Sequence, residues 1–233
     1  MTVSSLLDRQ VYLYSDVDRL VGLRPGTARR WINGYRRNGK SYEPILRIAA
    51  ADTEWATWGE FVEARILAEY RDQNVPTARL RAAVEGLRQM FGLRYPLAHL
   101  RPYLAPAAKQ LAIELQALDP SDESGQMIIR TKQLLLDSPS RVIIDNAKLA
   151  HDEQGEKYAA EIVPDLNFPG IVLNPDRYGG QPTFAERRVE VATIAGMARA
   201  GDAPEELAAD YGLSIVQVRE AIAYDAKHHL LAS

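Results

Sequence analysis

The chemistry that this sequence offers most clearly is electrostatic binding to phosphate. Between Arg19 and Lys40 there are seven lysine and arginine side chains and no aspartate or glutamate. Such a segment binds a nucleic-acid backbone by displacing its counterions, so its affinity should fall steeply as the salt concentration rises. The side chains that we expect to contact duplex DNA are Arg24, Thr27, Arg29, Arg30, Asn33, Arg36, Arg37 and Lys40.

A first short helix should position one side of this segment. Ser15, with Asp18 three positions later, predicts a capped helix start. Val17, Leu20 and Val21 follow at the i, i+3, i+4 spacing that gives a helix one apolar face. We therefore expect this helix to bury that face against the element that follows it.

A second helix should carry the basic side chains. Gly22 allows a sharp turn between the two helices, and Pro25 suits the first turn of the second one. Ala28, Trp31 and Ile32 repeat the apolar spacing and should face the first helix. The basic side chains are then left on the outer face, which is the arrangement of a helix-turn-helix unit.

A hairpin is expected directly after the second helix. Asn38-Gly39 is a strong signal for a two-residue type I′ turn, because both positions of that turn need positive φ. Its arms would be residues 35–37 and 40–48, with Pro44 restricting the second arm to an edge. A basic hairpin after a helix-turn-helix is a wing, and these residues together predict a winged helix.

Residues 14–31 resemble the start of a MerR-type winged helix-turn-helix. A Gly-Leu turn is followed by Thr27, Arg29 and Trp31, where that family usually has Thr, Arg and an aromatic residue. The family usually has a small polar residue before the proline, whereas this chain has Arg24. The resemblance implies DNA binding. The alternative is a small helical subdomain whose basic face is merely solvated.

A pair of longer helices should complete the front of the chain, residues 1–104. Thr57 and Glu60 form a capping box for a helix reaching about Gln73, and a second helix should run from near Pro76 to Phe91. This pair resembles the helices that follow the wing in MerR-type proteins. Three arginines lie off the apolar stripe of the second helix: Arg79, Arg81 and Arg88. We expect them to be solvated, and the alternative is that they extend the basic face.

The middle of the chain, residues 105–170, is expected to be a strand-rich module or linker with one helix near Gln133. QLAIELQ alternates apolar and polar residues, and QMIIR and RVIID are short β-branched runs, which favours strands, although periodicity does not separate strand from helix for MIIRTKQLLL. HDEQGEK should form a polar turn. The sequence indicates no function for this module.

The rear of the chain, residues 171–233, should contain three short helices. The first is expected over about 189–200 and should stop at Gly201, and the second should end at Tyr211 before Gly212. Capping boxes are predicted at the starts of the second and third helices: Asp202 with Glu205, and Ser214 with Gln217. The paired His228 and His229 should lie in a frayed, solvated helix end.

This rear module resembles the small VapB-like antitoxin family, an uncharacterised-domain family encoded beside PIN-type ribonuclease toxins. The likeness rests on the order and spacing of Ile171-Val172, Pro175, Gly179-Gly180-Gln181-Pro182, Ala200-Gly201, Glu206-Leu207, Tyr211, Leu213, Val218 and Ala221. The family's usual Gly-Thr-Arg turn is replaced by residues 185–189, Ala-Glu-Arg-Arg-Val. The resemblance implies an antitoxin whose partner is a PIN-domain, VapC-like toxin.

Charge is divided unevenly along the chain. Residues 1–104 hold 16 basic and 11 acidic side chains, whereas residues 105–233 hold 12 and 20. Within residues 185–233 there are five basic and eight acidic side chains. Since neutralising phosphate is the main source of non-specific affinity, we expect the front helix-turn-helix, and not the rear one, to bind DNA.

Composition excludes several other classes. The 233 residues are 46% hydrophobic and 25% charged, and the segment patterns predict a mainly α fold with a smaller β component, an α+β fold. Cysteine is absent, which excludes disulfides, cysteine-ligated zinc and thiol catalysis. No long apolar run or signal-like N-terminus is visible, so we expect a cytoplasmic protein. His99 has no visible partner and is expected to be structural. We expect no enzymatic activity, no catalytic residues, no metal and no cofactor.

Two functions remain open from the sequence. The first is an antitoxin of a type II toxin–antitoxin system, a DNA-binding homodimer that regulates transcription at its own operator and neutralises a PIN-type toxin. The alternative is a stand-alone MerR-like transcriptional regulator whose middle module senses a ligand. A third possibility is an adaptor with two protein-binding ends and no role in DNA binding.

Overall fold

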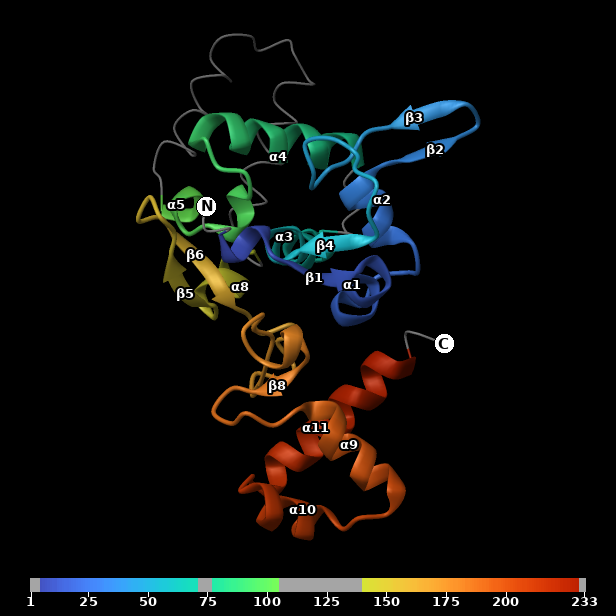
Figure 1. Cartoon of the computed structure of the whole chain (residues 1–233), viewed down its shortest axis with the longest axis vertical. Helices are drawn as coiled ribbons and strands as arrows, with labels where there is room; N and C mark the ends of the chain where they lie inside the picture. The colour runs from blue at the N-terminus through green and yellow to red at the C-terminus, as the bar shows by residue number, and fades with distance from the viewer. Residues whose placement is uncertain (1–4, 71–76, 105–139, 231–233) are drawn as a thin grey trace.

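The computed structural model describes residues 5–70, 77–104 and 140–230 (Figure 1). Over these ranges the chain is mainly helical, and its strands form small two-stranded antiparallel sheets. This is the predicted α+β class. Within the described ranges, no helix is both long enough and apolar enough to cross a membrane.

The front of the chain is built on one antiparallel strand pair, β1–β4, and the helices that follow its strands. β1 leads directly into α1, the hairpin β2–β3 follows α2, and β4 leads into α3. The bounds of these elements are β1 Gln10–Leu13, α1 Tyr14–Val21, α2 Thr27–Asn33, β2 Tyr35–Arg37, β3 Lys40–Tyr42, β4 Trp55–Thr57 and α3 Trp58–Ala68.

The two short helices start differently from the sequence prediction. α1 begins at Tyr14 and not after Ser15, and its cap is the side chain of Asp16, which accepts a hydrogen bond from the Leu13 N–H. α2 begins at Thr27, so Pro25 lies in the preceding turn and not in the helix. The predicted capping pair was wrong because Asp18 is buried and caps the neighbouring helix instead of its own.

The longer helices follow the prediction more closely. Thr57 and Glu60 form the predicted capping box of α3, although α3 ends at Ala68, before the predicted Gln73. α3 is buried on nearly all sides, so its polar side chains Glu60, Glu63 and Arg65 also lie in the interior. α4, Thr77–Phe91, ends at the predicted Phe91, where Gly92 has positive φ.

The middle of the chain packs against the front. It contains the 3-10 helix η3 (Pro96–Ala98), α5 (Arg101–Leu104), α8 (Ser140–Asp145), and the hairpin of β5 (Lys148–His151) and β6 (Lys157–Glu161). The run RVIID was predicted as a strand and is helical in α8, because Ile143 and Ile144 insert into the interior beside α3. The polar turn HDEQGEK is confirmed between β5 and β6. QLAIELQ, QMIIR and the helix near Gln133 lie outside the described residues.

The described part of the rear unit has three α-helices, as predicted, which follow a short strand pair. Its elements are β7 Ile171–Val172, the 3-10 helix η4 Tyr178–Gly180, β8 Thr183–Phe184, α9 Val191–Ala200, α10 Pro204–Tyr211 and α11 Ile215–Leu230. Gly201 and Gly212 end α9 and α10 in the left-handed conformation. Ser214 and Gln217 form their predicted capping box. The predicted Asp202–Glu205 box was wrong, because Ala203 precedes the helix and Pro204 occupies its first turn.

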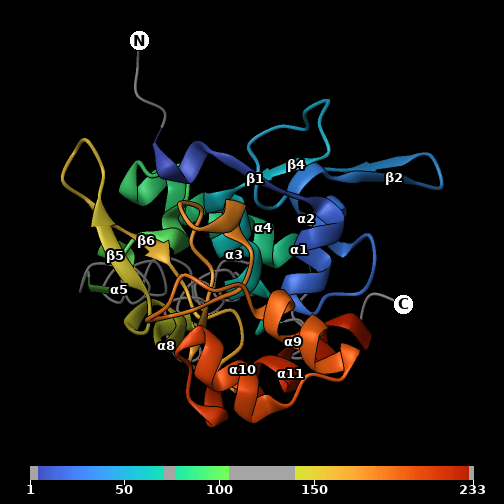
Figure 2. The same cartoon turned by 60° about the horizontal axis from the view of Figure 1, so that its bottom comes forward.

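The rear unit has its own buried cluster, and α11 extends from it toward α1 (Figures 1 and 2). The front cluster also includes Ile143, Ile144, Tyr158 and Ile162 from the middle of the chain. His228, which we expected to be solvated, is only 5% exposed and lies with its Nδ1 3.2 Å from the Arg19 carbonyl oxygen. The prediction failed because it could not anticipate that α11 packs against α1.

Candidate nucleic-acid interface

α1 and α2 pack through the apolar residues that the sequence identified. Val17, Leu20, Ala28 and Ile32 are fully buried, and Trp31 is nearly so. Gly22 takes the left-handed conformation at the end of α1, with φ of 72°, and so reverses the chain. The opposite face of α2 is therefore exposed to solvent, and the packing against α1 fixes the position of the helix.

The outward face of α2 and the turn before it carry exposed positive charge. Arg24, Arg29 and Arg30 are exposed. Arg30 donates a hydrogen bond to Thr27 Oγ1 at 3.0 Å. In the part of the chain that the structure describes, the guanidinium groups of Arg24 and Arg29 make neither a hydrogen bond nor an ion pair. Free guanidinium groups of this kind remain available to phosphate oxygens.

Two of the predicted contact residues are already engaged within the fold. Thr27 is buried and accepts the hydrogen bond from Arg30. Asn33 donates to the Ala51 carbonyl oxygen at 2.9 Å and accepts from the Ala51 N–H at 2.7 Å. Its amide therefore ties the end of α2 to the loop before β4, and Arg47 also donates to its oxygen.

The hairpin β2–β3 has the turn that the sequence predicted. Asn38 and Gly39 both have positive φ, 51° and 75°, and Arg37 lies opposite Lys40 in the register. β3 ends at Tyr42, so the second arm is shorter than the predicted residues 40–48. Arg36, Arg37 and Lys40 are exposed, and none of the three has an ion-pair partner among the described residues. Three free cations thus project from the hairpin.

The base of the hairpin is held by residues whose role the sequence did not show. Arg47 makes two hydrogen bonds to the carboxylate of Glu60, at 2.8 and 2.9 Å, and a third to Tyr14 Oη at 3.3 Å. Arg81 and Arg88 were predicted to be solvated, and that was wrong: both donate to backbone carbonyls between residues 43 and 46. The only signal in the sequence was that these arginines lie on one face of α4, seven residues apart.

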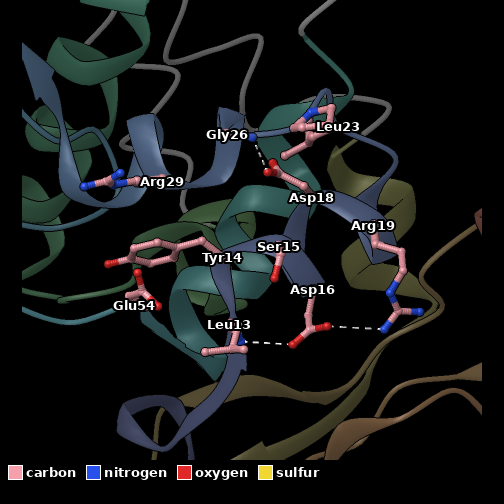
Figure 3. Close-up of a pocket in the computed structure, with 11 residues that line it drawn as sticks. Leu13, Tyr14, Ser15, Asp16, Asp18, Arg19, Leu23, Gly26, Arg29 and Glu54 are labelled. Carbon is pink, nitrogen blue, oxygen red and sulfur yellow. Dashed lines mark hydrogen bonds and ion pairs between the residues drawn. The ribbon is translucent and has the colours of Figure 1, made fainter. Parts of the chain in front are cut away.

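A cleft of about 520 Å³ lies beside α2, between α1 and the turn that follows it (Figure 3). Tyr14 and Arg29 lie on one side of it, and Asp16 and Arg19 form an ion pair on the other. Glu54 lies next to Tyr14. Because acidic and basic side chains alternate around this cleft, it does not extend the basic surface of α2 and the hairpin.

Asp18, which also lines this cleft, is held by backbone donors. Its oxygens accept hydrogen bonds from the Gly26 N–H at 2.6 Å and the Ala28 N–H at 2.7 Å. Burial raises the pKa of this carboxyl group, and the backbone hydrogen bonds and Arg30 oppose that shift. Asp18 therefore supports the start of α2.

In the described part of the rear unit, Arg187, Arg188 and Arg219 are exposed, but over residues 185–233 acidic side chains outnumber basic ones, eight to five. Arg199 pairs with Asp225 at 3.3 Å, and Lys227 pairs with Asp165. Glu220 accepts a hydrogen bond from the Gly170 N–H, so it holds the helix to the preceding loop. The exposed residues of α10 and the turn before it include four carboxylates: Asp202, Glu205, Glu206 and Asp210.

The sequence of the rear unit matches a family model. Residues 171–224 match the family described as a protein of unknown function, DUF433. These residues run from β7 to the middle of α11, so the match covers both strands and the rear helical bundle. It agrees with the predicted resemblance of this module to an uncharacterised domain family.

Two proteins of Mycobacterium tuberculosis (strain ATCC 25618 / H37Rv) are similar to nearly the whole chain. "Uncharacterized protein Rv2308" is 52% identical over 231 residues, which cover 99% of this chain and 96% of that protein. "Putative antitoxin VapB45" is 26% identical over 229 residues, which cover 92% and 93% of the two chains. The X-ray crystal structure of Rv2018 from the same species shares the fold, with a TM-score of 0.69 at 20% identity over 94% of this chain and 99% of that one.

These similarities extend over nearly the whole chain, well beyond the residues 171–224 that match DUF433. This chain belongs to the family of the mycobacterial protein Rv2308. Its more distant similarity to a protein described as an antitoxin agrees with the antitoxin resemblance of the sequence. The MerR-type resemblance of the front stays a prediction.

Proposed function

We propose that this chain is the antitoxin of a type II toxin–antitoxin pair, which binds operator DNA through α2 and the β2–β3 hairpin and neutralises a PIN-type, VapC-like ribonuclease. One observation carries the DNA-binding half: exposed cations without ion-pair partners among the described residues project from α2, whose other face is buried, and from the adjacent hairpin β2–β3. The antitoxin half is supported by the similarity to VapB45.

The dimensions of α2 suit this role. An α-helix with its side chains is about 10–12 Å across and fits into the major groove, which is about 12 Å wide, and the seven residues of α2 give it a length of about 10 Å. Arg29 and Arg30 would then face base edges or nearby phosphates, and Arg36, Arg37 and Lys40 would reach flanking phosphates from the hairpin. In this arrangement α1, α2 and the hairpin form a winged helix-turn-helix of the MerR type, and two copies in a homodimer would bind two half-sites.

The rear unit is assigned to the protein partner. Its exposed carboxylates on and before α10 would repel a phosphate backbone and attract a basic or metal-bearing toxin surface. The boundaries predicted from the sequence, 1–104, 105–170 and 171–233, then correspond to a DNA-binding part, a connecting module and a toxin-binding part. A chain of this kind would act in the cytoplasm and need no cofactor.

A gel-shift experiment tests the DNA-binding half. The probe is the duplex immediately upstream of the gene, and the variant combines Arg29→Ala, Arg30→Ala and Arg37→Ala. The matched control combines Arg187→Ala, Arg188→Ala and Arg219→Ala, which removes the same charge from exposed positions of the rear unit. We expect the shift to disappear with the first variant and persist with the control. Equal shifts with all three proteins would refute the assignment.

Co-expression tests the antitoxin half. The chain is produced with a tagged PIN-domain protein encoded beside its gene, and both copurification and rescue of growth from the toxin are scored. Copurification with rescue supports the proposal. Growth arrest that the chain does not relieve would contradict it.

The second function, a ligand-sensing regulator, is favoured by one feature. A cleft of about 730 Å³ lies between the front of the chain and the β5–β6 turn, and its lining includes Asp8, Arg94, Tyr95, His99 and Asp152. His99 is buried, with its Nδ1 2.8 Å from the Tyr95 carbonyl oxygen and its Nε2 3.5 Å from Asp152 Oδ2. If the chain shifts its upstream DNA but has no toxin partner, this cleft becomes the candidate ligand site.

A further inference from the structure

The return segment of the hairpin is held by side chains of α4. Arg81 donates from Nε to the Pro44 carbonyl oxygen at 2.9 Å and from Nη2 to the Glu43 carbonyl oxygen at 2.5 Å. Figure 1 shows α4 beside the base of β2–β3. One guanidinium group thus binds two successive carbonyls directly after the strand β3.

A second arginine on the same helix continues this pattern. Arg88 donates from Nη1 to the Ile45 carbonyl oxygen at 3.3 Å and from Nη2 to the Leu46 carbonyl oxygen at 2.7 Å. Four successive carbonyls, from residue 43 to residue 46, therefore accept hydrogen bonds from two arginines. We call Arg81 and Arg88 the α4 clamp.

The α4 clamp donates hydrogen bonds to the carbonyl groups of residues 43–46, which lie outside any strand. Pro44, Ile45 and Leu46 are buried, and buried carbonyls without hydrogen bonds are costly. The N–H groups of Ile45 and Leu46 both donate to the Trp31 carbonyl oxygen at the end of α2, at 2.7 and 3.0 Å. The segment is therefore fixed to α2 on one side and to α4 on the other.

Stacked side chains stiffen the hairpin, so a tilt at its base would also displace its turn. The rings of Tyr35 and Tyr42 stack at 4.5 Å with 6° between their planes. The turn at Asn38-Gly39 lies about four residues beyond the base, or about 13 Å in extended chain. A tilt of about 20° at the base would move it by about 4–5 Å, more than the length of a hydrogen bond.

We propose that the α4 clamp positions the wing for DNA: Arg81 and Arg88 fix the direction of β2–β3 relative to α2, so that Arg36, Arg37 and Lys40 reach phosphates while α2 lies in the groove. This inference rests on the proposed DNA-binding function. It gives α4 a part in DNA binding although neither clamp arginine touches the duplex. Arg81 is the residue to test, because Arg88 is buried beside Glu63 and its replacement would disturb the interior.

The test is a double-mutant cycle on Arg81. Arg81→Lys keeps the charge but loses the planar fork that binds two carbonyls. It is made in the natural chain and in a chain in which Arg36, Arg37 and Lys40 are alanine. Binding to the upstream duplex is measured by fluorescence anisotropy from 50 to 200 mM salt. Arg188→Lys, at an exposed arginine of the rear unit, is the matched control.

We expect Arg81→Lys to weaken binding. The plot of log binding constant against log salt concentration should become less steep by up to about 2.7, which is about 0.9 for each of three lost phosphate contacts. In the chain without wing charges it should have no effect, because the wing then has nothing left to position. An equal loss of affinity in both backgrounds would overturn the proposal. If the natural chain binds no DNA at all, the proposed function fails first, and the inference fails with it.

Hydrogen exchange of the free protein gives a readout that needs no DNA. In Arg81→Lys the amides of residues 35–46 should exchange faster, while those of α1 and α3 remain unchanged and report an intact core. Unchanged exchange over residues 35–46 would show that Arg81 does not hold the wing, and would overturn the proposal whatever the DNA result.

Discussion

The carboxylate of Asp18 in α1 accepts a hydrogen bond from the Ala28 N–H at the start of α2, with 2.7 Å between Oδ1 and nitrogen. Its other oxygen accepts from the Gly26 N–H. Since Gly26, the residue before α2, has no side chain to cap the helix, α1 supplies the cap from a distance. Asp18 of α1 therefore helps to set the orientation of α2, the helix that we propose lies in the major groove.

Removal of this carboxylate should destabilise the front of the chain. We predict that Asp18→Ala lowers the free energy of unfolding by about 1–2 kcal/mol, because two backbone N–H groups lose a charged acceptor. Urea denaturation measures the change. Asp52→Ala, at an exposed position, is the control and should change stability by less than about 0.5 kcal/mol. Equal effects of the two substitutions would argue against the cap.

Gly34 should tolerate no side chain. It has φ of 72° and ψ of −173°, and a Cβ placed on it would lie 2.5 Å from the Tyr42 carbonyl oxygen. Gly34→Ala is predicted to cost about 1–3 kcal/mol or more and to weaken DNA binding by displacing the hairpin. Gly39→Ala is the matched control, because Gly39 also has positive φ but nothing lies within 4 Å of its added Cβ. A smaller loss at Gly34 than at Gly39 would contradict the steric argument.

Glu63 should make stability depend on pH. Burial raises its pKa to about 8, and Arg88 and the Leu97 N–H only partly oppose that shift. Its Oε2 lies 3.6 Å from Arg88 Nη2 but accepts no hydrogen bond, which suits an uncharged carboxyl group. The folded chain retains this proton between pH 4.5 and about 8, whereas the unfolded chain releases it, so stability should fall as pH rises through that range.

Replacement of Glu63 by glutamine tests this dependence. The stability of Glu63→Gln should depend less on pH than that of the natural chain. Between pH 4.5 and pH 8, the free energy of unfolding of the variant should rise relative to that of the natural chain by at most about 5 kcal/mol. Urea denaturation of both proteins across this range gives the comparison. If their stability curves ran parallel, Glu63 would not carry the buried proton.

His228 should weaken the contact between α11 and α1 when it gains a proton. Burial lowers its pKa, although the Arg19 carbonyl and Asp165 favour the charged form. The neutral ring is thus preferred in the folded chain, and its contribution is lost as pH falls below the ordinary value of about 6.5. Hydrogen exchange of α1 and α11 should accelerate between pH 7 and pH 5.5, after correction for intrinsic rates. His228→Gln should not show this acceleration; if it does, another group is responsible.

Local signals in the sequence predicted local structure well. The apolar spacing of Ala28, Trp31 and Ile32 identified the buried face of α2, and Asn38-Gly39 identified the hairpin turn. The Thr57–Glu60 and Ser214–Gln217 boxes are also present. In each case the residues that carry the signal lie within four positions of one another, so the pattern can be read from a short stretch of sequence.

Contacts between distant segments were missed. Asp18 was assigned to its own helix start, but its partners lie eight and ten residues away. Arg81 and Arg88 were expected in solvent, but they bind carbonyls about 40 residues earlier in the chain. RVIID was expected to be a strand, since a β-branched run does not reveal that it packs beside α3. The exposed cations of α2 and the hairpin could be predicted, whereas the support that positions them could not.

Hydrogen exchange of the chain with and without its upstream duplex tests the central assignment most directly. We predict slower exchange in peptides that cover residues 24–42, from the turn before α2 to the end of β3, with no change over residues 185–230. Slower exchange over α9–α11, with residues 24–42 unchanged, would contradict the division of the molecule into a DNA-binding front and a protein-binding rear.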